Sequence, residues 1–430
     1  MINKYKMQNK FFNLYCLFDV LKMSAFDKMS PQAKQRYQDK QVRKLVRRAY
    51  YDVPFYKERF DKAGVHPDEI RTSADLAKLP VLTKEEYRKW MLEELEKPET
   101  QYFKKTQTSG STGIPTTNIY PPKEYAQHYM ADFFGWMKGG YNPFWGKTLT
   151  RQPGDSSVGT QSIVQKFGIL RRECFDTHWE REKIIEKIND YQPDFILCNS
   201  SELVYIAQYG LQEDRRIYKP QFYCPNGENI DGNTERILKK VYGDGLINLY
   251  GCTEMASFAV KSPGNTGYEI IEDLVTVNVK TEQGIQKSGE GTLLVTPLYR
   301  TQYPMLNYEI GDFVTLEYKN GYEYISKISG RKNDVFVWKS GKQTIYKRLE
   351  DINMNLKDIY QIRFIQESYE KLKIQVVKDP GTDKTQEELE RYLLGLYQKE
   401  FEDGVDIVFE WLQVIPPDPN GKIRNMISRL

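Results

Sequence analysis

The pattern of short apolar runs between about residues 102 and 260 is the feature that most constrains the fold of this chain. Runs rich in apolar and aromatic residues alternate with longer stretches of helix-forming residues, which indicates strands separated by helices. The order is typical of an α/β fold with a substantial parallel or mixed sheet. The predicted helices span 123–138, 179–191, 200–211 and 233–242, and the predicted strands include 194–198, 221–224 and 246–250.

Residues 1–95 are rich in Lys, Arg, Tyr and helix-forming residues, and two helix starts can be placed within them. Ser30 precedes Pro31, which favours a helix with proline at its first position. Thr83 is followed three residues later by Glu86, which is the pattern of a capping box. We therefore expect this region to be mostly helical.

The apolar segment 11–21 has some likeness to a signal sequence, but Asn13 and Asp19 interrupt it and no small-residue cleavage site follows. We expect an amphipathic helix at this place. Nothing later in the chain approaches the roughly eighteen uninterrupted apolar residues of a transmembrane helix. No integral membrane segment is expected.

Charge and cysteine usage exclude several classes of function. Lys and Arg number 62 against 59 Asp and Glu, and a net charge of +3 over 430 residues gives no case for a nucleic-acid or membrane partner. The five cysteines are odd in number and widely separated, so neither a disulfide framework nor a zinc site is indicated. A reducing compartment fits best, and we expect a cytoplasmic protein.

A chain of 430 residues should hold two or three domains. Between about 270 and 328 the pattern changes to β-hairpins, with turns expected at Gln283-Gly284, Gly289-Glu290-Gly291 and Asn320-Gly321. A polar link at 329–334 precedes about 95 residues that read β-α-β-β-α-β. The predicted parts are a helical region (1–95), a core with a β-rich subdomain (96–329) and a C-terminal domain (330–430).

A hydroxyl-rich loop lies near the start of the α/β region and consists of Thr108, Ser109, Gly110, Ser111, Thr112 and Gly113. Small residues leave backbone N–H groups uncovered, and glycine lets the backbone approach a ligand closely, so such a loop can bind phosphate. It is not a Walker A loop, because Gly113 is followed by Ile114 and Pro115 rather than by Lys and Ser or Thr. Alternating residues on both sides favour a loop between two strands. An ordinary surface turn is the alternative.

Three further polar clusters each follow a strand or a linker, where open α/β folds bind ligands. The run 250–254 offers a tyrosine that can stack on a base, a threonine that can reach a phosphate and a carboxylate that can hold Mg²⁺. In the run 308–312, Asp312 can accept hydrogen bonds from ribose hydroxyls. Lys422, in the run 419–424, can neutralise a phosphate or a carboxylate. The alternatives are a capped helix start, a solvated turn and a solvated lysine.

The order and spacing of these clusters resemble the adenylate-forming superfamily of acyl-CoA synthetases and related ligases. The compact length and the N-terminal helices resemble its phenylacetate–CoA ligase branch, which includes coenzyme F390 synthetase-like and CapK-like capsular polysaccharide proteins. The resemblance covers about residues 45–430. It implies a large N-terminal α/β domain with a β-rich subdomain and a small, mobile α+β C-terminal domain. It also implies a ligase that uses ATP and Mg²⁺, with CoA as co-substrate.

The resemblance assigns nucleotide-binding roles to matching positions. It implies that the loop 108–113 holds the ATP phosphates and that Gly227 and Glu228 lie along the adenine. Tyr250 matches a tyrosine that stacks on adenine, and Gly251 follows it in the same motif.

Other matched positions carry catalysis and ribose binding. The resemblance implies that Thr253 falls near the α-phosphate, that Glu254 is associated with Mg²⁺, and that Asp312 and Arg331 bind ribose. Because the family's catalytic lysine matches Lys422, we expect that residue to act in adenylation.

Asp334 falls at the family's hinge, about which the C-terminal domain turns between the two half-reactions. The chain departs from the family at two places. Thr116 and Thr117 stand where many members have a lysine, and Asn307 and Glu309 stand where arginine is common.

Substrate and acceptor follow only from the resemblance. The acyl pocket is matched to a region that holds Phe133, Phe134 and Trp136, and ordinary core packing is the alternative for these aromatics. An aryl or arylacetic acid is therefore a hypothesis. The acceptor is CoA, or an amine or hydroxyl on a surface-polysaccharide precursor in CapK-like members. A non-catalytic nucleotide-binding protein is a further alternative, and a homodimer is left open.

Overall fold

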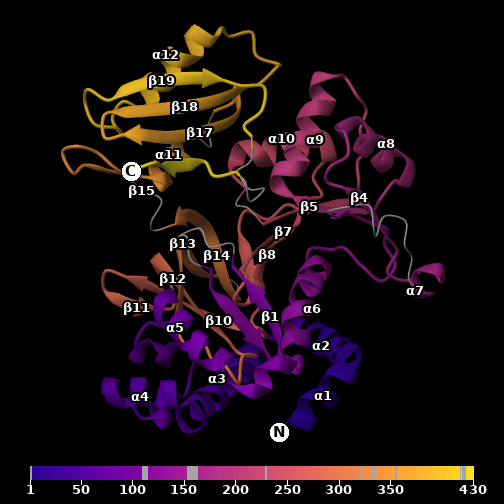
Figure 1. The fold of residues 1–430 in the computed structure, drawn as a ribbon, viewed down its shortest axis with the longest axis vertical. Coiled ribbons are helices and arrows are strands. Elements are labelled where there is room, and N and C mark those ends of the chain that lie inside the picture. Colours follow the sequence, from indigo (N-terminus) through magenta and orange to yellow (C-terminus); the bar gives the residue numbers. More distant parts are fainter. Residues whose placement is uncertain are drawn as a thin grey trace. The chain divides into compact units, whose positions relative to one another are not determined.

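The computed structural model describes residues 2–108, 115–152, 163–227, 230–319, 322–331, 335–353, 356–416, 418 and 423–430. The chain divides into two compact units, each built from two separate stretches (Figure 1). Unit 1 comprises Met1–Gly140 and Leu249–Ile328, and unit 2 comprises Tyr141–Asn248 and Ser329–Leu430. The domain limits expected from the sequence stay predictions.

Helices dominate the first stretch of unit 1, and both expected helix starts are confirmed. The Ser30 hydroxyl accepts a hydrogen bond from the Ala33 amide at 3.3 Å at the start of α3. Thr83 and Glu86 form the reciprocal hydrogen bonds of a capping box at α5. The helices of unit 1 are α1 (Ile2–Lys10), α2 (Phe12–Asp27), α3 (Pro31–Asp52), α4 (Pro54–Ala63), η1 (Pro67–Glu69), η2 (Ala74–Lys78), α5 (Lys84–Leu95), η3 (Pro98–Tyr102) and α6 (Pro122–Lys138).

An eight-stranded sheet with the order β11-β10-β12-β13-β14-β9-β8-β7 forms the centre of unit 1, and β1 pairs separately with β2. Strand β10 pairs antiparallel with β11 and β12, as expected for a region of hairpins. The strands are β1 (Lys104–Gln107), β2 (Thr117–Tyr120), β7 (Asn248–Cys252), β8 (Ala256–Lys261), β9 (Tyr268–Ile270), β10 (Val275–Thr281), β11 (Gly284–Gln286), β12 (Gly289–Pro297), β13 (Tyr308–Lys319) and β14 (Tyr322–Arg331).

The turn predicted at Gly289-Glu290-Gly291 is wrong, because these residues begin strand β12. A Cβ atom on Gly291 would lie 2.2 Å from the Lys280 carbonyl oxygen, so glycine permits the close approach of β10. The expected turn at Asn320-Gly321 lies outside the described residues.

Aromatic side chains pack the N-terminal helices onto the segment before β13. The rings of Phe55 and Trp90 stack with centroids 4.6 Å apart. The Tyr56 hydroxyl donates to the Pro304 carbonyl oxygen at 2.9 Å and accepts from the Leu306 amide at 2.9 Å. These contacts fix the chain that enters β13, which carries Asp312.

The first stretch of unit 2 contains a parallel sheet with the order β4-β3-β5-β6. The helices and strands predicted for this stretch are confirmed to within a few residues, and buried Ile and Leu side chains of the helices share a core with the sheet. The elements are β3 (Thr148–Gln152), α7 (Ile163–Lys166), β4 (Arg172–Asp176), α8 (Arg181–Tyr191), β5 (Phe195–Asn199), α9 (Ser200–Gln212), β6 (Phe222–Asn226) and α10 (Gly232–Tyr242).

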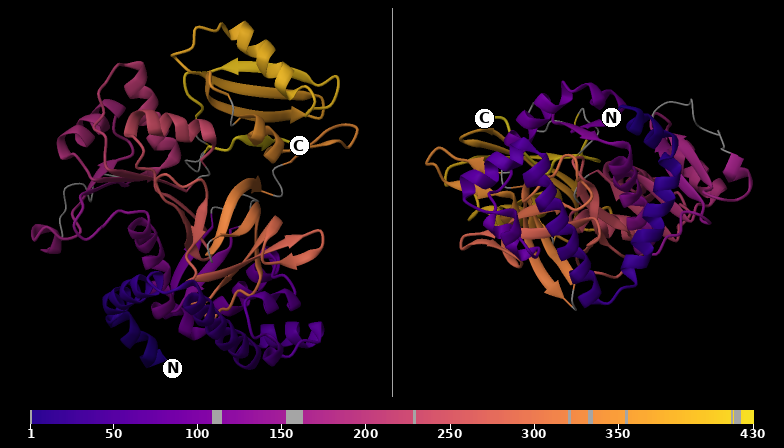
Figure 2. Two further views of the ribbon diagram at one scale, coloured as in Figure 1. Left: turned by 180° about the vertical axis from the view of Figure 1, so that it is seen from behind. Right: turned by 90° about the horizontal axis from the view of Figure 1, so that it is seen from below.

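The second stretch of unit 2 contains a mixed sheet with the order β19-β18-β17-β20, and α12 lies across it (Figures 1 and 2). The predicted β-α-β-β-α-β outline is confirmed from β16 to β19. The α/β fold class is likewise confirmed. The elements are β15 (Val335–Val337), β16 (Gln343–Ile345), α11 (Tyr346–Asn353), β17 (Ile359–Ser368), β18 (Lys371–Lys378), α12 (Gln386–Tyr397), β19 (Asp406–Trp411) and β20 (Met426–Ser428).

Candidate functional site

Strand β7 and the turn that follows it carry the run 250–254 in unit 1. The turn leads directly into β8, and a Cβ atom on Gly251 would lie 2.1 Å from the Ala256 carbonyl oxygen. Only glycine therefore fits at this close approach of two backbones. The expected alternative of a capped helix start is wrong, because a strand follows the motif.

Glu254 is buried, with 4% of its surface exposed, yet its carboxylate has polar partners. Its Oε1 accepts a hydrogen bond from the Tyr308 hydroxyl at 3.1 Å and lies 3.5 Å from the Lys84 ammonium. Burial of a carboxylate is costly unless such partners interact with it. Lys84 and Glu254 lie far apart in the sequence, so local sequence patterns cannot reveal this contact.

Tyr250 and Asp312, matched to adenine and ribose binding, are brought together. The Tyr250 hydroxyl donates a hydrogen bond of 2.7 Å to Asp312 Oδ2. Burial, reinforced by the negative charge of Asp312, raises the pKa of Tyr250 well above its usual value, so the phenol stays protonated and can donate. Gly311, which precedes Asp312, has a φ of +91°, a conformation that glycine adopts without strain.

A buried arginine, Arg300, holds the backbone of the turn that follows β7. Arg300 has 0% of its surface exposed and donates from Nη1 to the Glu254 carbonyl oxygen at 2.8 Å. Its guanidinium lies 4.3 Å from the centre of the Tyr120 ring. The Tyr120 hydroxyl in turn donates to the Thr253 and Glu254 carbonyl oxygens at 2.9 and 2.8 Å. The backbone of the motif is thus held by the side chains of Arg300 and Tyr120, and no local sequence pattern groups either residue with it.

The strands expected on either side of the hydroxyl-rich loop 108–113 are confirmed as β1 and β2. Strands β1 and β2 pair antiparallel, and the Thr116 amide donates to the Thr108 hydroxyl at 2.9 Å. Ser109, Gly110, Ser111, Thr112 and Gly113 lie outside the described residues.

The three aromatics matched to the acyl pocket lie on α6, and they differ in burial. Phe134 is buried in the core of unit 1, as the packing alternative expects. Phe133 and Trp136 are partly exposed and contact each other, with ring centroids 5.6 Å apart. The helix approaches β7 closely, because a Cβ atom on Gly135 would lie 2.7 Å from the Leu249 side chain.

The remaining predicted residues belong to unit 2. Gly227 follows β6 with a φ of +83°, and the backbone of Arg331 ends β14. Glu228, Asp334 and Lys422 lie outside the described residues.

The stretch that holds Lys422 is bracketed by an ion pair. Arg424 Nε lies 2.5 Å from Asp418 Oδ2, and the Arg424 carbonyl oxygen accepts from Arg363 at 2.9 Å. The Asn425 amide donates to the Tyr346 hydroxyl at 2.9 Å. These contacts fix the chain on the C-terminal side of Lys422.

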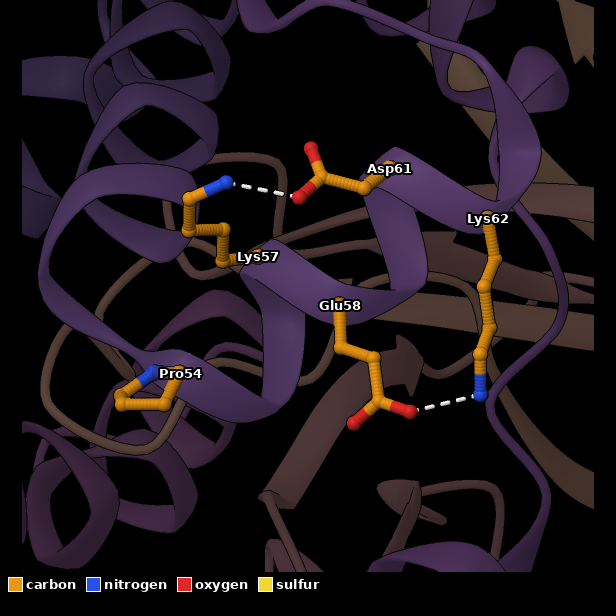
Figure 3. Close-up of a pocket in the computed structure, with 5 residues that line it drawn as sticks. All are labelled: Pro54, Lys57, Glu58, Asp61 and Lys62. Carbon is orange, nitrogen blue, oxygen red and sulfur yellow. Dashed lines mark hydrogen bonds and ion pairs between the residues drawn. The ribbon is translucent and has the colours of Figure 1, made fainter.

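A shallow depression on α4 is lined by Pro54, Lys57, Glu58, Asp61 and Lys62 (Figure 3). Lys57 pairs with Asp61 and Lys62 pairs with Glu58, each at 2.6 Å along one helix. Since these charges neutralise each other, the depression offers no set of groups aimed at a ligand. Across the described parts of the chain, no three His, Cys, Asp or Glu side chains form a metal-binding group. No described helix combines the length and apolar character that crossing a bilayer requires.

Comparisons with known proteins agree with the fold. A model of the CapK C-terminal domain matches residues 336–429. Protein CapK of Staphylococcus aureus is 26% identical over 404 residues, which cover 87% of this chain and 85% of CapK. Phenylacetate–coenzyme A ligase of Aromatoleum evansii is 24% identical over 340 residues, which cover 73% of this chain and 74% of that ligase.

A solved structure of 2-hydroxyisobutyryl-CoA ligase in complex with 2-HIB-AMP has a TM-score of 0.71 to this chain at 16% identity. The match covers 93% of this chain and 90% of that ligase. At such low identity the likeness establishes the fold. With the relatives found by sequence, it confirms the family resemblance that the ordered motifs predicted.

Proposed function

We propose that this chain, which belongs to the adenylate-forming superfamily in its phenylacetate–CoA ligase and CapK-like branch, activates a carboxylate with ATP and passes the acyl group to CoA. The observation that carries the proposal is the pairing of Tyr250 with Asp312 beside the buried Glu254 in unit 1. An aromatic ring, a ribose-binding carboxylate and a carboxylate next to a cation are the groups that a nucleotide site needs.

In this proposal Tyr250 stacks on the adenine, and Asp312 accepts hydrogen bonds from the ribose hydroxyls. A carboxylate has two oxygens with several acceptor directions, so a bond from Tyr250 to Oδ2 is compatible with bonds from ribose. The family resemblance implies nucleoside-binding roles for Gly227 and Arg331 of unit 2 as well. The loop 108–113 offers backbone and hydroxyl donors to the phosphates.

The first half-reaction depends on positioning of the two substrates and on neutralisation of the phosphate charge more than on covalent catalysis by the protein. An oxygen of the substrate carboxylate forms a bond to the α-phosphorus of ATP. The bond between that phosphorus and the bridging oxygen breaks, and pyrophosphate leaves with the electron pair. Lys422 neutralises charge in the transition state, and Thr253 lies near the α-phosphate. Lys84 is a further residue that would neutralise charge at this site, because its ammonium lies 3.5 Å from the Glu254 carboxylate.

Glu254 is the residue that would hold Mg²⁺, since carboxylate oxygens are the ligands that this ion takes. Its Oε1 is oriented by Tyr308, so the side chain is fixed before any ion binds. When bound, Mg²⁺ would neutralise the phosphate oxygens.

In the second half-reaction the sulfur of CoA forms a bond to the acyl carbon and its proton is released. The bond from that carbon to the phosphate oxygen breaks, and AMP leaves. A turn of the C-terminal domain about Asp334 would withdraw Lys422 and admit the thiol. Phe133 and Trp136, being partly exposed, are the better candidates for contact with the acid than Phe134.

A second acceptor is favoured by a specific observation. The CapK C-terminal model covers residues 336–429, and CapK matches 87% of the chain. A CapK-like enzyme would pass the acyl group to an amine or hydroxyl of a surface-polysaccharide precursor.

The test is pyrophosphate release from ATP over a panel of carboxylates, with and without CoA, and identification of the product by mass. An acyl-CoA product that requires CoA would support the thiol acceptor. Accumulation of acyl-AMP in the presence of CoA would favour the other acceptor. Absence of release with every acid would contradict adenylation and favour a nucleotide-binding protein without catalysis.

A further inference from the structure

Helix α2 exposes an apolar stripe made of Leu14, Leu17, Phe18 and Leu21. These positions are spaced i, i+3, i+4 and i+7 within one helix, so the four side chains lie on one face of it. Phe18 and Leu21 each have 59% of their surface exposed, and the exposed Phe11 precedes the helix. Four bulky apolar side chains grouped on one helix face are more than scattered surface residues.

The opposite face of α2 packs in the protein. Val20, Met23 and Phe26 are buried, and the Phe12 ring stacks on Tyr125 of α6 at 5.7 Å. Figures 1 and 2 show α2 beside α6. The amphipathic helix expected for segment 11–21 is therefore wrong in one respect. Asp19 is buried while apolar residues face outward, so α2 is apolar on two faces and only one has a partner in unit 1.

Lysines flank the stripe. Lys10 precedes α2 and Lys28 follows it, and both are exposed, as are Lys4 and Lys6 of α1. Lys22 lies 4.0 Å from the buried Asp273 carboxylate and is held within unit 1.

The acidic residues of the same segment are occupied by the protein. Asp19 is buried, and Asp27 pairs with Lys138 at 2.9 Å and with Lys34 at 3.8 Å. The outward face thus combines bulky apolar side chains with cations at its edges. The small net charge of the whole chain conceals this local excess.

We propose that the apolar stripe of α2, with the exposed lysines of the same N-terminal segment, binds the surface of an anionic lipid bilayer, independently of the catalytic function. Phe and Leu side chains insert at the boundary of headgroups and acyl chains, and the flanking lysines pair with anionic headgroups. A second copy of the chain is the competing occupant. It would place lysine against lysine and would offer no acidic side chain from this face, whereas anionic lipids supply the complementary charge.

The experiment uses the full chain in sedimentation with vesicles of phosphatidylcholine, alone or mixed with phosphatidylglycerol. We expect binding to the mixed vesicles that weakens at high ionic strength. The double variant Phe18→Gln/Leu21→Gln should lower the partition constant by about tenfold or more. The variant Lys4→Glu/Lys10→Glu should lose the preference for anionic vesicles.

The matched control is Tyr51→Gln/Leu92→Gln, since both residues are also 59% exposed in unit 1 but lie away from the stripe. It should bind like the unchanged chain. Circular dichroism and the unfolding midpoint establish that each variant is folded. Failure of the unchanged chain to bind anionic vesicles, or equal binding by the stripe variant, would overturn the proposal. A dimer that the stripe variant converts to monomer, without vesicle binding, would assign the face to a second copy.

Discussion

Replacement of Asp312 by Asn isolates the charge of the proposed ribose acceptor. The amide has nearly the same shape as the carboxylate, and its oxygen can still accept the 2.7 Å hydrogen bond from Tyr250. The substitution therefore leaves the local packing in place and removes only the negative charge. We expect the fold to be retained.

The expected loss follows from two hydrogen bonds to ribose. Bonds to a charged group contribute about 1.5–3 kcal/mol and neutral bonds about 0.5–1.5 kcal/mol, a difference of roughly 1 kcal/mol for each. Two hydroxyls give about 2 kcal/mol, which corresponds to roughly a 30-fold loss in kcat/KM for ATP. Most of it should be a higher KM, because ribose is bound equally in the ground and transition states.

The assay is pyrophosphate release at varied ATP with a saturating carboxylate. Asp383→Asn is the matched control, since Asp383 is exposed in unit 2 and has no proposed role. It should have the kinetics of the unchanged enzyme. An unaltered KM and kcat in folded Asp312→Asn would refute the assignment of Asp312 to ribose.

Three further predictions concern the support of the site. Arg300→Met leaves carbonyl oxygens unpaired in the core and should lower the free energy of unfolding, measured in urea, by about 3 kcal/mol. The control Arg215→Met, at an exposed arginine, should change that free energy little. Equal losses in the two variants would contradict the supporting role of Arg300. Gly251→Ala should cost about 2 kcal/mol in the same assay, because its Cβ would lie 2.1 Å from a carbonyl oxygen, whereas Gly395→Ala, with nothing within 4 Å, should not destabilise. Burial and the nearby Arg300 lower the pKa of His128 from 6.5 to about 3, so its contribution to stability is present above pH 6.5 and is lost as pH falls toward 3. His128→Asn should flatten that part of the pH dependence of unfolding, and an unchanged slope would argue against a neutral His128.

Features that depend on neighbouring residues could be predicted from the sequence. The caps at Ser30 and Thr83 are local hydrogen bonds, and each was found where expected. The strands of the parallel sheet in unit 2 are short buried runs, which periodicity locates well.

Features that depend on distant residues could not be predicted. Arg300 reaches Ile119 and Tyr87 across 181 and 213 positions, and no local pattern distinguishes it from a surface arginine. The outward face of α2 was misjudged because the burial of Asp19 depends on the packing of the helix. At Gly289-Glu290-Gly291 a turn signal was overridden by pairing of these residues with β13, and Gly291 also permits the close approach of β10.

The central claim is adenylation of a carboxylate with help from Lys422. Its most direct test is carboxylate-dependent exchange of labelled pyrophosphate into ATP, measured for the unchanged chain, for Lys422→Ala and for Lys399→Ala, an exposed lysine of the same unit. We expect exchange by the unchanged chain and by Lys399→Ala, and loss of exchange in Lys422→Ala without a change in the unfolding midpoint. Exchange retained by Lys422→Ala would contradict the central claim.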